Sequence, residues 1–259
     1  MNYPLLRQGD RLPVVGVLQK LLSRTGVAAT ADGDFGPRTS AAVHRFQSER
    51  RIGGNGTVES ITWERLCAGE RSLRIVDCVD VFDPSLYRLE RADIERVGGN
   101  PIAIGGMSNG VEQAISLIVS AAPPGSVMLL RFHGHGGPGT AGVGVGDGSA
   151  GWGGNRSTVD GHAPAAMTRL FGRLRPIFGP YGSIQFMHCS TGQGPAGRAL
   201  LDSIARGTGV PVTAALRDQL GGGSTTFRYE GPTHTSLPHG GALSAWCRAL
   251  PDFVGASVR

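Results

Sequence analysis

Two short apolar runs in the second half of the chain each end abruptly in reactive side chains and glycine. The first covers residues 127–132 and is followed by His-Gly-His-Gly-Gly, which contains His133 and His135. The second covers residues 183–187 and is followed by His-Cys-Ser-Thr-Gly, which contains Cys189. An apolar run of this length, bounded by turn residues, predicts a buried strand. Residues just beyond such strands lie at the carboxyl edge of an open α/β sheet, so the pattern predicts that a thiol and imidazoles meet there.

Strands and helices alternate around these two runs. Apolar or alternating runs predict further strands, and apolar residues at helical spacing predict helices between them. The order strand–helix–strand predicts an α/β domain with a mostly parallel sheet flanked by helices. The pair Asp83-Pro84 is expected to end the first strand, and residues 138–161 and 220–240 are expected to form loops or hairpins. The expected strands also include residues 72–82, 101–104 and 210–214, and the expected helices are residues 111–122, 163–178, 194–206 and 242–250.

The first 67 residues have a different pattern. Apolar residues recur at helical spacing in three segments, which are separated by the turn at residues 32–36 and by the glycine-rich break at residues 53–56. Proline and serine at the starts of the later segments suit the first turn and the cap of a helix. The pattern predicts a small all-α three-helix domain at residues 1–69, followed by the α/β domain at residues 70–259.

Several separated motifs in the first domain resemble the helical peptidoglycan-binding domain attached to many bacterial cell-wall hydrolases. The resemblance implies that peptidoglycan is a partner. One departure is that the family's second Asp-Gly-x-Val-Gly turn is here Gly54-Asn-Gly-Thr-Val58, without the aspartate. The alternative is that the domain serves as a structural spacer or folding aid. The motifs are Leu6-Arg-Gln-Gly-Asp10, Val17-Leu-Gln19, Asp32-Gly-Asp-Phe-Gly36, Ala42-Val-His-Arg-Phe-Gln47 and Thr62-Trp-Glu-Arg-Leu66.

A thiol and an imidazole at neighbouring strand ends are the minimum parts for nucleophilic acyl transfer, because the imidazole takes the proton and the thiolate attacks a carbonyl. The second domain also resembles the caspase-like cysteine peptidases, which include caspases, metacaspases and gingipains, over roughly residues 73–250. In that family an apolar strand ends in His-Gly and a later strand ends in Cys. The resemblance implies that Cys189 is the nucleophile and His135 the general base, 189 − 135 = 54 residues apart, with His133 at a position usually held by serine.

The same resemblance implies further parts of the site. Backbone N–H groups of Gly136 and Cys189 would hold the oxyanion. Arg217 and Asp218 would lie near the pocket for the side chain before the cut, where Asp218 suits a basic group and Arg217 an acidic one. No acidic third member can be named from the sequence.

Other interpretations stay open. His133 rivals His135 because it also precedes a glycine, whereas His188 is expected to point to the opposite face of its strand as a core residue. A metal hydrolase is a second class, since His-x-His pairs bind zinc, with Asp147, His162 or His188 completing the site. A third class is a non-catalytic peptidoglycan-binding protein in which Cys189 is an inert core thiol.

Composition and charge argue against several classes of protein. The chain has 259 residues and a net charge of +5, and among its basic residues only Lys20 is a lysine. No basic run indicates a nucleic-acid partner, and no segment has the length and apolarity of a signal peptide or a membrane span. Four cysteines are too few for a disulfide scaffold, although a pair between Cys67 and Cys78 stays open. We expect no cofactor and no metal.

These observations predict a cell-wall-targeted cysteine hydrolase that cleaves amide bonds through a Cys-His dyad. Peptidoglycan peptides are the expected substrate, as in a lysin or an antibacterial effector. A wall-anchored caspase-like protease acting on proteins is the competing hypothesis, because a wall-binding domain raises the local substrate concentration in either case. The expected location is the cell wall or periplasm after non-standard export, and otherwise the cytoplasm.

Overall fold

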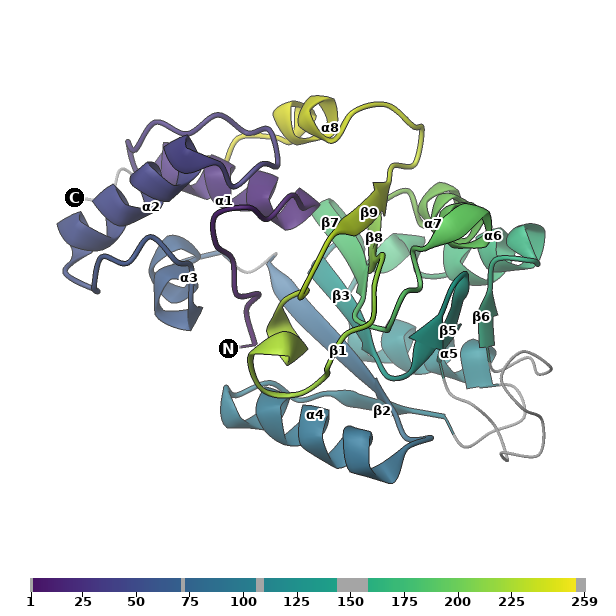
Figure 1. Ribbon diagram of the computed structural model, residues 1–259. Coiled ribbons are helices and arrows are strands. Elements are labelled where there is room, and N and C mark those ends of the chain that lie inside the picture. The colour runs from purple at the N-terminus through teal and green to yellow at the C-terminus, as the bar shows by residue number, and fades with distance from the viewer. Residues whose placement is uncertain (1, 71–72, 106–109, 144–157, 255–259) are drawn as a thin grey trace.

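The computed structural model describes residues 2–70, 73–105, 110–143 and 158–254 (Figure 1). Three helices come first, and an α/β domain with a six-stranded sheet follows, which confirms the fold expected from the sequence. Within these residues, every helix is too short or too polar to cross a membrane.

Prolines at the helix starts and a buried tryptophan help to stabilise the helical domain. Proline occupies the first turn of the first two helices, where its missing N–H costs nothing. Trp63 is fully buried, donates a 2.8 Å hydrogen bond to the carbonyl oxygen of Pro4, and stacks on Tyr3 with ring centroids 5.6 Å apart. The side chain of Gln19 fixes the turn at Asp32, because it accepts from the Asp32 N–H at 2.9 Å and donates to the Asp32 carboxylate at 2.7 Å. The three helices are α1 (Pro13–Arg24), α2 (Pro37–Arg50) and α3 (Ser60–Leu66).

The six-stranded sheet has the order β2-β1-β3-β7-β8-β9. Strands β2, β1, β3, β7 and β8 pair in parallel, and β9 pairs antiparallel to β8 at the edge. The central strand β3 is buried along its whole length, as its apolar sequence predicts. The strands are β1 (Arg74–Asp80), β2 (Ile102–Ile104), β3 (Val127–His133), β7 (Phe178–Phe186), β8 (Val212–Ala215) and β9 (Thr233–Ser236).

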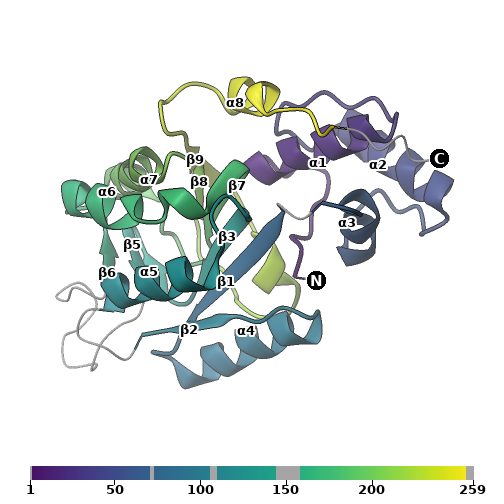
Figure 2. The same ribbon diagram turned by 180° about the vertical axis from the view of Figure 1, so that it is seen from behind.

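Helices cover both faces of the sheet (Figures 1 and 2). On one face, α5 (Gly110–Ala121), α6 (Pro164–Gly172) and α7 (Gly194–Thr208) share a hydrophobic core with the strands. On the other face, α4 (Pro84–Arg96) packs on β1, and a 3-10 helix, η2 (Gly223–Phe227), packs on α4. The last helix, α8 (Leu243–Ala249), packs on α1.

A second, antiparallel sheet follows β3 directly and lies beside the carboxyl edge of the main sheet (Figure 1). Its strands are β4 (Gly136–Gly137), β5 (Thr140–Gly142) and β6 (Thr158–Asp160). Strands β5 and β6 lie near the two ends of residues 138–161, where the sequence predicts a loop or hairpin, and β4 lies just before this segment. Asp147, one of the metal ligands considered from the sequence, lies outside the described residues.

The helical domain and the sheet share one hydrophobic core. Side chains of all three N-terminal helices belong to the same buried cluster as Met128, Leu129 and Tyr181. The start of the chain also contacts the sheet, because the carbonyl oxygen of Asn2 accepts a 2.6 Å hydrogen bond from Arg131. The helical domain lies at the end of the sheet where β1 begins (Figures 1 and 2).

Several details differ from the sequence pattern. The pattern does not predict α4, because its buried face carries Glu90 and Asp93 beside Ile94 and so lacks apolar periodicity. The helix expected at residues 163–178 ends at Gly172 and continues as a 3-10 helix, η1 (Arg175–Ile177), before β7. All four cysteines are free, so the open pairing of Cys67 with Cys78 does not occur.

Candidate active site

Neighbouring strands bring the two reactive segments together. In the β3–β7 pair, Phe132 lies opposite Phe186, an offset of 186 − 132 = 54 residues. The N–H of Met187 donates a 2.8 Å hydrogen bond to the carbonyl oxygen of Phe132, so the pairing persists at the strand end. His135 follows the end of β3 by two residues and Cys189 follows the end of β7 by three, and these two residues are also 54 positions apart.

Glycine allows a close approach at these strand ends. A Cβ atom at Gly136 would lie 2.6 Å from the Cβ of His188, so β4 lies directly against the segment that follows β7. Gly134 has φ +148°, and a Cβ there would lie 2.9 Å from the Cβ of Asp80 at the end of β1. The segment that carries His135 therefore lies between the carboxyl ends of β1 and β7.

His135 is bonded to a carboxylate from α4. Its Nε2 lies 3.0 Å from Oδ2 of Asp83, and the two side chains are 42% and 38% exposed. Asp83 also caps α4, because its carboxylate accepts from the N–H groups of Ser85 at 2.8 Å and Leu86 at 3.2 Å. The hydrogen bond from His135, with those backbone bonds, lowers the pKa of Asp83 below its ordinary value. A carboxylate in this position orients the imidazole.

His133 belongs to a fully buried ionic network. Its Nε2 lies 3.0 Å from Oδ1 of Asp77, and Arg131 donates to both oxygens of Asp77 at 2.6 Å and 3.0 Å. Burial opposes ionisation of Asp77, but the charge of Arg131 and the bonds from His133 outweigh it and hold the pKa of Asp77 far below its usual range. Glu90 lies 4.0 Å from Nδ1 of His133, and burial raises the pKa of Glu90. His133 is 0% exposed, so a substrate in solution does not reach it.

His188 is a core residue, in agreement with the sequence analysis. It is fully buried, its Nε2 lies 2.9 Å from the carbonyl oxygen of Gly142, and burial lowers its pKa to about 3. His162 is exposed. Within the described part of the chain, no three His, Cys, Asp or Glu side chains gather as metal ligands. The described residues of the metal hypothesis therefore do not form one site.

Cys189 differs from the other three cysteines in its exposure. It is partly exposed, whereas Cys67, Cys78 and Cys247 are buried. Burial raises the pKa of Cys67 and of Cys247 to about 12, and that of Cys78 well above its ordinary value. These three thiols are therefore protonated at neutral pH, and Cys189 is the thiol open to a substrate.

The segment after β8 lies against the Cys189 thiol. The Sγ of Cys189 accepts a 3.3 Å hydrogen bond from the N–H of Gln219 and donates a 3.4 Å hydrogen bond to the carbonyl oxygen of Gln219. The adjacent Ser190 donates from its hydroxyl to Asp218 at 2.6 Å and from its N–H to the carbonyl oxygen of Arg217 at 3.0 Å. The structure therefore brings the Asp218 side chain and the Arg217 backbone to the segment that follows Cys189, and both residues are exposed.

The backbone N–H groups of Gly136 and Cys189, which the resemblance assigns to an oxyanion hole, lie at these strand ends. His135 and Gly142 face each other as a hydrogen-bonded pair, joined by a 2.8 Å bond to the carbonyl oxygen of His135. The next pair, Gly136 and Ala141, is then non-hydrogen-bonded, so the N–H of Gly136 points away from β5. The N–H of Cys189 donates no hydrogen bond to any described residue. Gly136 and Cys189 thus retain the donors that the sequence analysis assigns to them.

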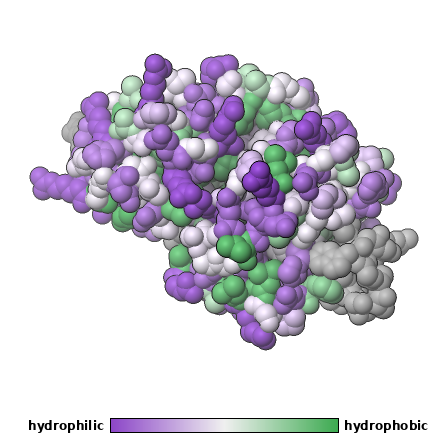
Figure 3. Space-filling model, in the orientation of Figure 1, coloured by the Kyte–Doolittle hydropathy of each residue, from purple (hydrophilic) through white to green (hydrophobic). Residues whose placement is uncertain are grey.

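Apolar side chains border the site. Leu220, directly after Gln219, is 86% exposed, and Phe82, directly before Asp83, is 40% exposed. A Cβ at Gly222 would lie 2.4 Å from Leu89, so this segment lies against α4. Figure 3 shows hydrophobic side chains gathering over α4 on an otherwise mostly hydrophilic face.

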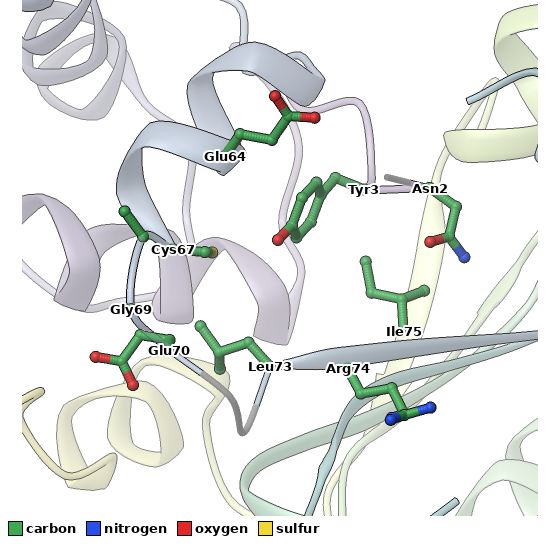
Figure 4. A pocket seen from close by; sticks show the side chains of 10 residues that line it. Asn2, Tyr3, Glu64, Cys67, Gly69, Glu70, Leu73, Arg74 and Ile75 are labelled. Atoms are coloured by element: carbon green, nitrogen blue, oxygen red, sulfur yellow. The ribbon is translucent and has the colours of Figure 1, made fainter. Parts of the chain in front are cut away.

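A cavity of about 550 Å³ lies at the junction of the two domains, away from Cys189. In Figure 4 the hydroxyl of Tyr3 points toward Cys67, and Leu73 and Ile75 from the start of the sheet lie below. Because the cavity is at the start of β1 and the reactive residues are at the ends of β3 and β7, it is not part of the Cys189 site. Its lining is Asn2, Tyr3, Glu64, Cys67, Ala68, Gly69, Glu70, Leu73, Arg74 and Ile75.

Comparison with known families identifies the first domain. Residues 11–66 match the model of the family described as "Putative peptidoglycan binding domain". The chain therefore carries a peptidoglycan-binding domain followed by an α/β domain with a mostly parallel sheet, and the first domain indicates association with the cell wall. Neither the curated proteins nor the solved structures contain a match to the chain.

Proposed function

We propose that the protein is a cysteine hydrolase that cleaves amide bonds in the cell wall. Cys189 is the nucleophile, His135 is the general base and then acid, and Asp83 orients His135. The observation that supports the proposal is the parallel pairing of β3 with β7, because a half-exposed histidine bonded to a carboxylate follows one strand and a partly exposed thiol follows the other. The resemblance to the caspase-like cysteine peptidases assigns the same Cys and His.

The reaction uses only groups at this edge of the sheet. His135 donates from Nε2 to Asp83, so Nδ1 is the basic nitrogen that takes the Cys189 proton. The thiolate then adds to the substrate carbonyl carbon, and the N–H groups of Gly136 and Cys189 hold the oxygen that becomes negative. Collapse of this intermediate expels the amine, which takes the proton from His135. Water, deprotonated by His135, then hydrolyses the thioester and restores the free thiol.

Peptidoglycan peptides are the substrate that fits the first domain best. A domain that binds peptidoglycan raises the concentration of stem peptides and cross-links around a linked amide-cleaving site. The pairing of the two domains therefore supports hydrolysis of these peptides, as in a lysin or an antibacterial effector.

Digestion of purified sacculi tests the proposal. The wild-type protein should release soluble peptide fragments with new amine and carboxyl ends, identified by mass spectrometry. Cys189→Ala should release none and keep the fold, because alanine retains most of the packing of a small side chain. Cys67→Ala is the matched control, since it removes a buried thiol and should leave product release in place. Release of fragments by Cys189→Ala would refute the assignment of the nucleophile.

A second candidate, a wall-anchored protease acting on proteins, is supported by the apolar border of the site. Leu220 at 86% exposure and Phe82 at 40% exposure offer contacts to apolar side chains, which proteins carry more often than stem peptides do. Unfolded protein substrates, incubated beside the sacculi, distinguish the two. Faster cleavage of the proteins, again lost in Cys189→Ala, would favour the protease.

A further inference from the structure

Arginines gather around one cavity on the helical domain. The cavity, about 470 Å³ in volume, lies where the C-terminal ends of the three helices meet. Arg24 is the last residue of α1, Arg50 is the last of α2, Arg51 follows it as the cap, and Arg65 lies in the last turn of α3. Its lining is Arg24, Thr25, Glu49, Arg50, Arg51, Arg65, Leu66 and Ala68.

The positive charge around the cavity exceeds the partial negative charge of the three helix C-termini. Arginine near a helix C-terminus complements the helix dipole, and three such ends together carry about −1.5 charges. Among the lining residues, Arg24 pairs with Glu70, and Glu49 pairs with Arg45 outside the cavity. Three arginines, at positions 50, 51 and 65, therefore remain against the helix ends and leave a positive surplus.

The N–H groups of these three guanidinium groups are available to bind a ligand. Within the described part of the chain, none of them donates a hydrogen bond to the protein. Arg50 lies over the ring of Phe46, 5.7 Å from its centroid, which supports the flat face of the guanidinium and leaves its N–H edge for a ligand.

Arg24 lines the same cavity, but its terminal nitrogens are already bonded to Glu70 and to the carbonyl oxygen of Leu66. Its side chain is 9% exposed, and its Nε is buried with no hydrogen-bond partner. Arg24 therefore adds charge to the cavity wall, and the donors that face a ligand belong to the other three arginines.

The backbone at Arg51 also favours a role for its side chain. Arg51 caps α2 with φ 55° in the left-handed region, where glycine or asparagine is usual. Glycine would relieve this strain, so arginine at this position is not explained by the fold.

We propose that this cavity binds the oxyanion groups of a wall polymer. Guanidinium groups bind carboxylate and phosphate in a bidentate manner, which suits both the carboxylates of peptidoglycan stem peptides and the phosphates of phosphodiester polymers attached to the wall. This inference rests on the proposed association with the cell wall, and it specifies the groups through which the first domain would bind the wall.

Sedimentation of the full chain with sacculi tests the site, with Cys189→Ala in every variant so that the wall is not digested. Arg51→Gly, Arg65→Gln and the double variant remove charge from the cavity. Arg51→Gly should keep or raise the thermal midpoint of unfolding, because glycine suits the left-handed cap, and it should still weaken binding. The double variant should bind about tenfold more weakly. Added salt should weaken wild-type binding in parallel.

Arg38→Gln is the matched control, because Arg38 is exposed at the opposite end of α2 and carries the same charge. Its binding should equal that of the parent chain. Sacculi stripped of phosphodiester polymers with hydrofluoric acid separate the two sources: retained arginine-dependent binding identifies carboxylates, and its loss on stripping identifies phosphates.

Three results would contradict the anion site, and one of them would also contradict the association with the wall. Unimpaired binding by the double variant refutes the anion site and leaves the wall association standing. An equal loss in Arg38→Gln shows diffuse charge instead of a site. Failure of the parent chain to sediment with sacculi contradicts both the site and the association with the wall.

Discussion

Two histidines, two positions apart, should fail in different ways when each is replaced by leucine. His133→Leu removes a buried donor to Asp77, and a hydrogen bond to a charged group contributes about 1.5–3 kcal/mol. At about 2 kcal/mol the thermal midpoint should fall by roughly 4–8 °C for a domain of this size. Turnover per folded molecule should persist, because this side chain does not reach the substrate.

His135→Leu should do the reverse. The side chain is 42% exposed and its loss should change the free energy of unfolding by less than about 0.5 kcal/mol. Loss of the general base should lower kcat/KM by a factor on the order of 10⁴.

The assay pairs thermal unfolding, followed by circular dichroism, with release of peptide fragments at a temperature where both variants are folded. The reasoning depends on the burial of one histidine and the exposure of the other. A stable His133→Leu without turnover, beside an active His135→Leu, would show that the site uses His133.

Three further outcomes follow from the same geometry. Asp83→Asn should keep the cap of α4, because asparagine caps as well as aspartate does, while kcat/KM falls by a factor of up to about 10⁴; unchanged activity would remove Asp83 from the site. Burial lowers the pKa of His188 to about 3, so below about pH 6.5 the unfolded chain takes up a proton at this residue and the native chain does not. The free energy of unfolding should therefore decrease by about 1.4 kcal/mol for each pH unit that the pH falls between 6.5 and 3. Urea midpoints at pH 7 and pH 5 measure this, and equal midpoints would contradict it. A thiol alkylator should give one adduct under native conditions, at Cys189, and peptide mapping that found the first adduct at Cys67, Cys78 or Cys247 would contradict the burial of those thiols.

Asp83, the proposed third member of the site, shows where prediction from the sequence stops. Asp83-Pro84 marks the end of a strand in the sequence, and the same pair is a cap and first-turn proline of α4. The sequence alone permits this second interpretation. It does not favour it, because the buried face of α4 carries Glu90 and Asp93, whose partners lie elsewhere in the fold, and therefore lacks the apolar periodicity that predicts a helix.

Other features follow from apolar pattern alone. The order and direction of β3 and β7 could be predicted, since each is a buried run with a reactive end. The burial of His133 could not be predicted, because it depends on Asp77 of the neighbouring strand β1, which bonds both His133 and Arg131 of β3. The edge strand β9, with the sequence Thr-His-Thr-Ser, has no apolar run and is recognised only through its pairing with β8.

The place of the helical domain constrains how it serves the reaction. It packs where β1 begins, whereas His135 and Cys189 lie beyond the other ends of the strands, and seven residues of β3 span about 23 Å. A sugar or peptide bound at the arginine cavity therefore does not also reach the thiol, so in the proposed function the domain acts as a tether. Because Met128, Leu129 and Tyr181 pack in one core with the helices, this tether is rigid.

A rigid tether has a consequence that a flexible linker lacks. A polymer held at the helical domain presents to Cys189 only the bonds at a fixed distance along it or on a neighbouring strand of the wall, so cleavage should favour regularly spaced bonds. The shared core also means that deletion of residues 1–69 would expose apolar side chains of the sheet and unfold the remainder. Surface variants such as Arg51→Gly, which leave the core intact, therefore separate wall attachment from catalysis where truncation does not.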